Sequence, residues 1–143
     1  MNHLLWMAPL LLMYQSHNQK PPLAFYQIPE EIRERATVVV SATYSKGRTP
    51  CMVRSDGTRV WAIDSSFHIK RLYRGEVRTK LFSINASMLP ESRYVEKQLE
   101  VKNQYLVLLQ PHPEKMKALK KGDGIYFWNS LREDEIVAIV EIK

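Results

Sequence analysis

The middle of the chain reads Phe67-His68-Ile69-Lys70-Arg71-Leu72-Tyr73-Arg74-Gly75. Its aromatic and branched residues predict a strand, and the glycine that closes it predicts a turn. Further along, Leu99–Leu109 ends in the continuous apolar run Tyr-Leu-Val-Leu-Leu, which is typical of a buried central strand. The two stretches together predict a protein built mainly from β-strands.

Turn signals divide the rest of the chain into further short elements. Residues 45–57 contain Gly47, Pro50 and Asp56-Gly57 and are expected to form a loop. A short helix is expected over residues 112–121, because Pro113 suits its first turn and Gly122 its C-terminal cap. Strands are expected over residues 37–44, 59–64, 67–73, 77–84, 104–109, 125–128 and 135–142. Many short strands with little helix predict an antiparallel barrel or sandwich.

The order of these elements resembles the netrin-like (NTR) domain, the OB-type β-barrel that is shared with tissue inhibitors of metalloproteinases. The resemblance rests on Tyr73-Arg74-Gly75 and on Tyr105–Leu108, and it covers residues 36–109, about half of the chain. It implies an OB-like antiparallel β-barrel with one or two short helices and a binding role without catalysis. Inhibitors of that family chelate zinc through an N-terminal cysteine. The one cysteine here, Cys51, lies in the expected loop, so that mechanism is not supported.

The N-terminal part of the chain differs in composition from the rest. Leu4–Tyr14 has no charge and is too short to span a bilayer as a helix. We therefore expect residues 1–20 to be a signal peptide or apolar leader, residues 21–35 a linker, and residues 36–143 a single domain. Within the linker, residues 30–35 could form a short helical turn after Pro29. The open alternative is an apolar segment that packs on the domain or on a neighbour. Export would make the protein secreted and would make Asn85, in the sequon Asn85-Ala86-Ser87, a glycosylation site.

Positive charge is the main functional signal. The net charge is +6 and the sequence pI is about 9.5, which favours anionic partners. Simple alternation along the strand would put Lys70 and Leu72 on one face and Arg71 and Tyr73 on the other. The alternative is an ordinary solvated surface. The candidate binding residues are Lys46, Arg48, Arg54, Arg59, Lys70, Arg71, Arg74, Arg78 and Lys80.

Three classes of function are consistent with these features. The leading hypothesis is an exported, non-catalytic module that binds an extracellular protein or an anionic glycan. An intracellular OB-type nucleic-acid-binding protein is the alternative, and an enzyme with Cys51 as nucleophile is a third. The sequence indicates no cofactor and no metal site, because its acidic groups at 30–34 and 133–135 resemble solvated turns or helix starts. The aromatic residues available for base stacking, each of which is also a candidate for the core, are Tyr44, Trp61, Phe127 and Trp128.

We predict that the full reading frame, expressed in a eukaryotic secreting host, yields a secreted protein. Its N-terminal sequence should begin after residue 16 to 20, since the apolar segment would be cleaved as a signal peptide. Intact mass measurement would also detect a glycan at Asn85. An uncleaved chain retained in the cell would contradict the prediction.

Overall fold

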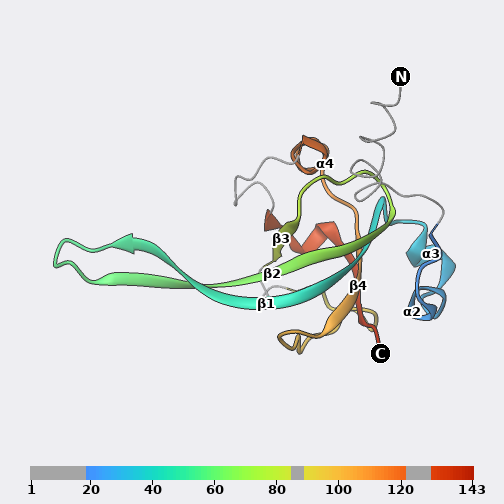
Figure 1. Cartoon of the computed structure of the whole chain (residues 1–143), viewed down its shortest axis with the longest axis horizontal. Coiled ribbons are helices and arrows are strands. Elements are labelled where there is room, and N and C mark those ends of the chain that lie inside the picture. Colours follow the sequence, from blue (N-terminus) through green and yellow to red (C-terminus); the bar gives the residue numbers. More distant parts are fainter. Residues whose placement is uncertain (1–18, 85–88, 122–129) are drawn as a thin grey trace, which may run out of the picture.

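The computed structural model describes residues 19–84, 89–121 and 130–143, and for residues 47–52, 60–64, 118, 121 and 130 it describes the backbone alone. These ranges contain short helices and one extended sheet (Figure 1). The helices are α2 (Leu23–Tyr26), α3 (Glu30–Arg33) and α4 (Pro113–Lys121). The strands are β1 (Val38–Val53), β2 (Arg59–Arg74), β3 (Leu81–Ile84), β4 (Gln104–Leu109), β5 (Ser130–Leu131) and β6 (Ile136–Glu141), with the 3-10 turn η3 (Glu133–Glu135) between the last two.

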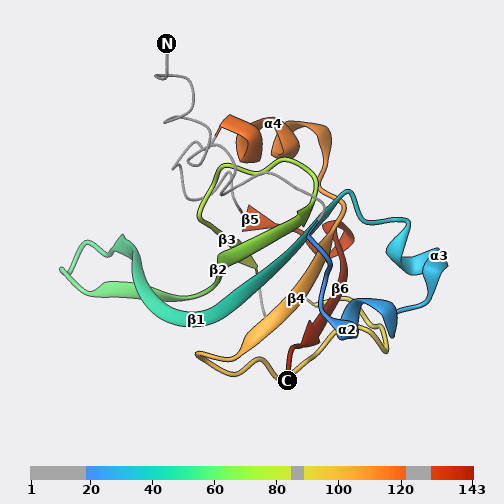
Figure 2. The ribbon, with the colours of Figure 1, turned by 45° about the vertical axis from the view of Figure 1, so that its right-hand side comes forward.

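The strands form one sheet in the order β5-β3-β2-β1-β4-β6. Neighbouring strands are antiparallel, except that β3 and β5 run parallel. Because β5 and β6 follow each other in the chain but lie at opposite ends of this order, the sheet curls and η3 joins its two edges (Figure 2). The result is a half-barrel. The predicted mainly β, OB-like architecture is confirmed.

An aromatic core fills the inside of the curl. Tyr44, Phe67, Phe82 and Tyr105 are each at most 1% exposed. The Phe67 ring stacks on Phe82 with 5.4 Å between centroids and meets Tyr105 edge-on at 6.0 Å. The hydroxyl of Tyr44 is hydrogen-bonded to Ser65 Oγ at 2.9 Å. Burial of each large apolar side chain contributes about 1.5–3 kcal/mol. This cluster therefore stabilises the four strands that carry its side chains, β1, β2, β3 and β4.

A second layer covers the outer face of the sheet. Residues 21–35, for which a linker was expected, form α2 and α3. Of these, α3 agrees with the helical turn expected after Pro29, whereas α2 was not expected. Phe25 and Ile28 of this segment are buried against Val39, Leu106 and Leu108 from β1 and β4. The prolines of the segment made it resemble a linker, but they precede the two helices. β4 and the first part of β1, residues 38–44, are therefore covered on both faces.

The largest difference from the sequence-based expectation concerns residues 45–57. Only residues 54–58 form a turn, at the expected Asp56-Gly57, because β1 continues to Val53 and pairs with β2 as far as Arg59. The segments 59–64 and 67–73 likewise belong to one strand, β2. Residues 46–64 form a two-stranded arm that projects from the body of the protein (Figure 1). Gly47 and Pro50 pair within the arm without ending it, and Cys51 has no Cα partner at the bulge between Pro50 and Met52.

Elsewhere the expected elements agree with the structure or are shortened. The strand over residues 104–109, the helix at 113–121 and the last strand are confirmed. The strand expected over 77–84 begins at Leu81. The segment 125–128, including Phe127 and Trp128, lies outside the described residues. No helix in the described ranges combines the length and apolar character needed to cross a membrane.

Gly75 ends β2 in a conformation that requires glycine. Its φ is +90°, and a Cβ built there would lie 2.6 Å from the carbonyl oxygen of Thr37. Gly57 in the arm turn has a similar φ of +86° but no atom within 4 Å of such a Cβ. A side chain at Gly57 would therefore meet backbone strain alone, whereas a side chain at Gly75 would meet the same strain and a steric clash.

We predict that Gly75→Ala lowers the free energy of unfolding more than Gly57→Ala does. Strain at positive φ costs about 1–2 kcal/mol in both variants, and the clash at Gly75 adds about 1–3 kcal/mol. Urea denaturation followed by circular dichroism measures both losses. Equal losses would show that the backbone near Thr37 moves freely enough to accept a side chain.

Candidate anion-binding site

The outer side of β2, which faces away from the aromatic core, carries small hydroxyl groups and a histidine. Thr43 lies opposite His68, and Ser45 lies opposite Ser66. The Oγ of Ser45 is 3.2 Å from that of Ser66 and 3.1 Å from His68 Nε2. His68 is exposed, and the other three are half-buried. This arrangement offers hydrogen-bond donors and acceptors at the surface, next to the charged residues that follow along β2.

A β-bulge then presents two cations in succession. Ser41 lies opposite Arg71 and Ala42 opposite Ile69, so Lys70 is the extra residue of the bulge. Ile69 packs against the inner core, and Leu72 belongs to it, whereas Lys70 and Arg71 are both exposed. The alternation predicted from the sequence, with Lys70 and Leu72 on one face, is therefore wrong at this point, because a bulge shifts the alternation by one residue. Thr43, Ser45, Ser66, His68, Lys70 and Arg71 are called the outer β2 face below.

Two further predicted residues lie in the connection between β2 and β3. The carbonyl oxygen of Lys80 accepts a hydrogen bond from the N–H of Ile69 at 2.8 Å, which fixes Lys80 beside the bulge. The N–H of Arg78 donates to the carbonyl oxygen of Leu119 in α4 at 2.8 Å. Both charged residues are exposed. The backbone of Lys80 therefore lies next to the bulge that carries Lys70 and Arg71.

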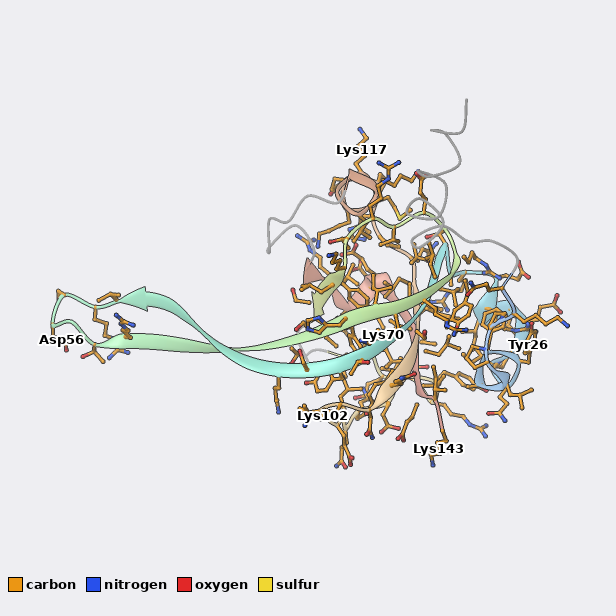
Figure 3. All side chains as sticks on the ribbon, viewed as in Figure 1. Tyr26, Asp56, Lys70, Lys102, Lys117 and Lys143 are labelled. Carbon is orange, nitrogen blue, oxygen red and sulfur yellow. The ribbon has the colours of Figure 1, made fainter. Side chains whose placement is uncertain are left out.

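The remaining predicted cations of the first hairpin lie along the arm. Lys46 is exposed at its base, and Arg54 and Arg59 are exposed at its tip. Arg48 lies opposite Ile63 in the arm, and its side chain is not among those described. The arm separates Arg54 and Arg59 from Lys70, as the labels Asp56 and Lys70 show (Figure 3). The nine predicted residues therefore do not form one patch.

The arm tip is a tight turn with one acidic group. The N–H of Arg54 donates to the carbonyl oxygen of Thr58 at 2.8 Å, and the N–H of Thr58 donates to Asp56 Oδ1 at 2.8 Å. Hydrogen bonds from the side chain and backbone of Thr58 hold the pKa of Asp56 below its usual range. The tip therefore keeps a negative charge between Arg54 and Arg59, which weakens its attraction for anions.

Arg74 has a different role from the other predicted cations. Its Nη1 donates to the carbonyl oxygens of Arg33 at 2.8 Å and Ala36 at 2.9 Å. Its guanidinium also lies 5.7 Å from the centre of the Phe25 ring. These contacts tie the end of β2 to the α2–α3 layer. Arg74 is therefore held by the fold, whereas Lys70 and Arg71 remain on the surface.

The aromatic residues proposed for base stacking are not gathered at this face. Tyr44 is buried in the core. Trp61 lies opposite Pro50 in the arm, and its side chain is not among those described. The proposed glycosylation site Asn85 also lies outside the described residues. The sequence thus named Lys70, Arg71 and Lys80, but it gave no sign of the hydroxyl groups beside them, which only strand pairing reveals.

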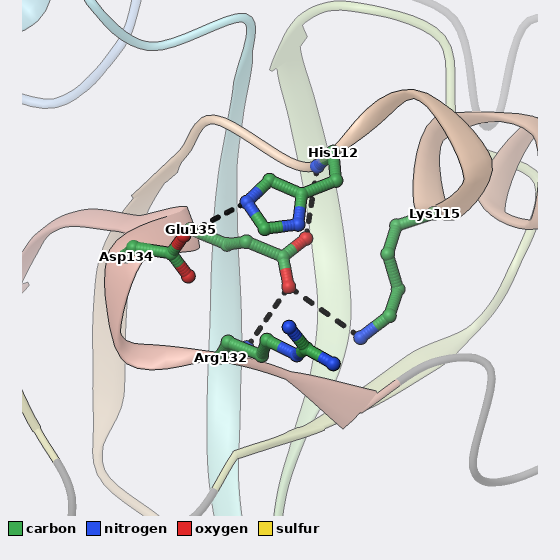
Figure 4. A network of polar contacts seen from close by, with 5 residues as sticks. All are labelled: His112, Lys115, Arg132, Asp134 and Glu135. Carbon is green, nitrogen blue, oxygen red and sulfur yellow. Dashed lines mark hydrogen bonds and ion pairs between the residues drawn. The ribbon is translucent and has the colours of Figure 1, made fainter.

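A second polar cluster closes the sheet at the C-terminal end of β4 (Figure 4). The Glu135 side chain is fully buried, and its carboxylate accepts hydrogen bonds from the N–H groups of His112 at 2.9 Å and Arg132 at 3.0 Å. Lys115 Nζ lies 3.4 Å from the same carboxylate. His112 Nε2 is 2.9 Å from Asp134 Oδ2. Glu135 was expected in a solvated turn or a helix start. It lies in the 3-10 turn η3, and its burial corrects the expectation that it is solvated.

The composition of this cluster is also that of a metal site, because ligand atoms of His112, Asp134 and Glu135 lie within 4.8 Å of one another. The Glu135 carboxylate, however, is already satisfied by two backbone N–H groups and one ammonium group. A cation would have to displace the Lys115 ammonium, whose side chain is 15% exposed, from its ion pair with the fully buried Glu135, which is unfavourable. The geometry therefore supports a structural role for the cluster in holding α4 and η3 together.

No known protein family and no curated protein matches the sequence. The netrin-like resemblance therefore stays a prediction.

We predict that Arg74→Ala lowers the free energy of unfolding by about 2 kcal/mol, because it removes two charge-assisted hydrogen bonds to backbone carbonyls. Arg71→Ala, which removes an exposed cation of the same strand, should change it by less than about 0.5 kcal/mol. Urea denaturation of both variants checks this. Equal effects would contradict the division of these arginines into a structural and a surface group.

Proposed function

We propose that this chain is a non-catalytic binding module of OB type that recognises an anionic glycan through the outer β2 face. The observation that carries the proposal is the bulge at Lys70, which puts Lys70 and Arg71 side by side on the surface, with the backbone of Lys80 hydrogen-bonded to the preceding Ile69. In the described part of the chain, none of these three is engaged in an ion pair with a carboxylate. Their charge is therefore available to an external anion.

The hydroxyl groups of the face support a sugar ligand. Ser45, Ser66 and His68 form a hydrogen-bonded row at the surface, and such groups can exchange hydrogen bonds with sugar hydroxyls or sulfate oxygens. In OB folds, the face of the second and third strands and the loop between the first two strands form the usual binding surface for oligosaccharides and oligonucleotides. The outer β2 face and the arm occupy these positions.

The described aromatic residues favour a glycan over a nucleic acid. Binding of single strands relies on aromatic side chains on which bases stack. Tyr44, Phe67 and Phe82 all belong to the inner core. Among the described side chains on the outside of β2, rings are supplied by His68 and the half-buried Tyr73. This surface therefore offers charge and hydrogen bonds rather than a stacking platform.

Two parts of the proposal rest on the sequence. The uncharged segment Leu4–Tyr14 supports export, which would bring the protein into contact with extracellular glycans. The resemblance to the netrin-like domain supports a binding role without catalysis. A protein with an acidic surface would use the same cations, and it is the alternative partner of this face.

We predict that heparin, a sulfated glycan, binds the protein with an affinity that falls as salt concentration rises. The double variant Lys70→Gln/Arg71→Gln should weaken binding about tenfold or more, equivalent to about 1.4 kcal/mol, and should reduce the salt dependence because fewer counterions are exchanged. Isothermal titration calorimetry measures both effects.

The matched control is Lys117→Gln/Lys120→Gln, which removes two exposed charges from α4. Its heparin affinity should stay close to that of the unaltered chain. Equal weakening in both double variants would mean that only net charge matters, and it would refute a defined glycan site. Tighter binding of single-stranded oligothymidylate than of heparin at the same salt concentration would make nucleic acid the ligand.

A further inference from the structure

Two arginines meet around one aromatic side chain in the α2–α3 layer. The guanidinium carbon of Arg33 lies 5.2 Å from the centre of the Phe25 ring, and that of Arg74 lies 5.7 Å from the same centre. Arg33 also lies 5.7 Å from the centre of the Tyr26 ring, which meets Phe25 edge-on. Both arginines are half-buried. Two like charges thus lie near the same aromatic ring.

The positive charge of this pair is not balanced by a carboxylate. Among the described residues, neither Arg33 nor Arg74 takes part in an ion pair. The Nε of Arg33 is buried and has no hydrogen-bond acceptor among the described residues. Buried donors in native proteins are nearly always satisfied, and an exception calls for an explanation such as a bound ion. An oxygen-rich anion would supply the missing acceptor.

The rest of the geometry suits such an anion. Nη1 of Arg74 is fixed by the carbonyl oxygens of Arg33 and Ala36, so its guanidinium plane is held in place. The planar fork of an arginine matches the oxygen atoms of sulfate and phosphate groups. Tyr26, whose ring lies 5.7 Å from the Arg33 guanidinium, is 53% exposed, so the Arg33 side of the layer borders solvent.

We propose that Arg33 and Arg74 form an oxyanion site that binds a sulfate or phosphate group. A doubly charged tetrahedral anion balances two guanidinium groups and provides an acceptor for Arg33 Nε. The label Tyr26 marks this region, at the end of the molecule opposite the arm tip at Asp56 (Figure 3). The site is separate from the outer β2 face, so its test does not depend on the glycan proposal.

The test is an NMR titration of the ¹⁵N-labelled full chain with sodium sulfate, sodium phosphate or sodium acetate. Sodium chloride keeps the ionic strength constant. The Nε–Hε signal of Arg33, assigned by its loss in Arg33→Lys, reports directly on the unpaired donor. We expect a saturable shift of this signal with sulfate or phosphate. The signal of the exposed Arg35, which lies just after α3, should not move. A linear change with every salt, or saturation with acetate alone, would overturn the proposal.

Paired variants provide a second readout. Sulfate should raise the melting temperature of the unaltered chain and of Arg35→Gln by the same amount, and that of Arg33→Gln by clearly less. Arg35→Gln is the matched control because it removes the same charge from an adjacent exposed position. An equal rise in all three proteins would show general stabilisation by salt and would contradict a site. If Arg33→Gln does not fold, the titration of the unaltered chain decides alone.

Discussion

A buried carboxylate, that of Glu135, holds together the place where the curled sheet closes. This carboxylate accepts hydrogen bonds from the N–H groups of Arg132 and His112 and forms an ion pair with Lys115. The carbonyl oxygen of Glu135 accepts a further hydrogen bond from the N–H of Gln110 at 2.8 Å. The end of β4, the start of α4 and the link between β5 and β6 meet at this residue. An unpaired buried charge is strongly unfavourable, so closure of the sheet and satisfaction of Glu135 depend on each other. The curl in turn encloses the aromatic core and turns the outer β2 face toward solvent.

Elements with a strong local signal could be predicted from the sequence. The apolar run over residues 104–109 marked a central strand, and Pro113 marked the start of α4. The Asp56-Gly57 pair marked the turn of the arm. The pairing of residues 45–53 could not be predicted, because Gly47 and Pro50 are typical of loops, and only the facing strand shows that they pair. Three features of the sites depend on contacts distant in sequence: the bulge at Lys70, the burial of Glu135, and the hydrogen bonds of Arg74 to Arg33 and Ala36. The sequence therefore identified the basic residues, but it could not show which of them are exposed and which hold the fold together.

The same strand links these observations to function. Along β2, the hydroxyl row with His68 comes first, the bulge with Lys70 and Arg71 follows, and Arg74 ends the strand under the α2–α3 layer. The inward side chains Phe67 and Leu72 anchor β2 in the core, so the outward side chains are held on a rigid support. A rigid, charged and hydroxyl-rich surface loses little conformational entropy on binding, which suits recognition of an extended anionic chain.

The central claim is that the outer β2 face, and not positive charge in general, binds the anionic glycan. The most direct measurement is the mapping of backbone amide shifts in the ¹⁵N-labelled protein during titration with a short heparin oligosaccharide. The account predicts that the largest changes occur at residues 65–71 and at Lys80, with small changes in α4. Changes of similar size at the exposed lysines of α4 would contradict it.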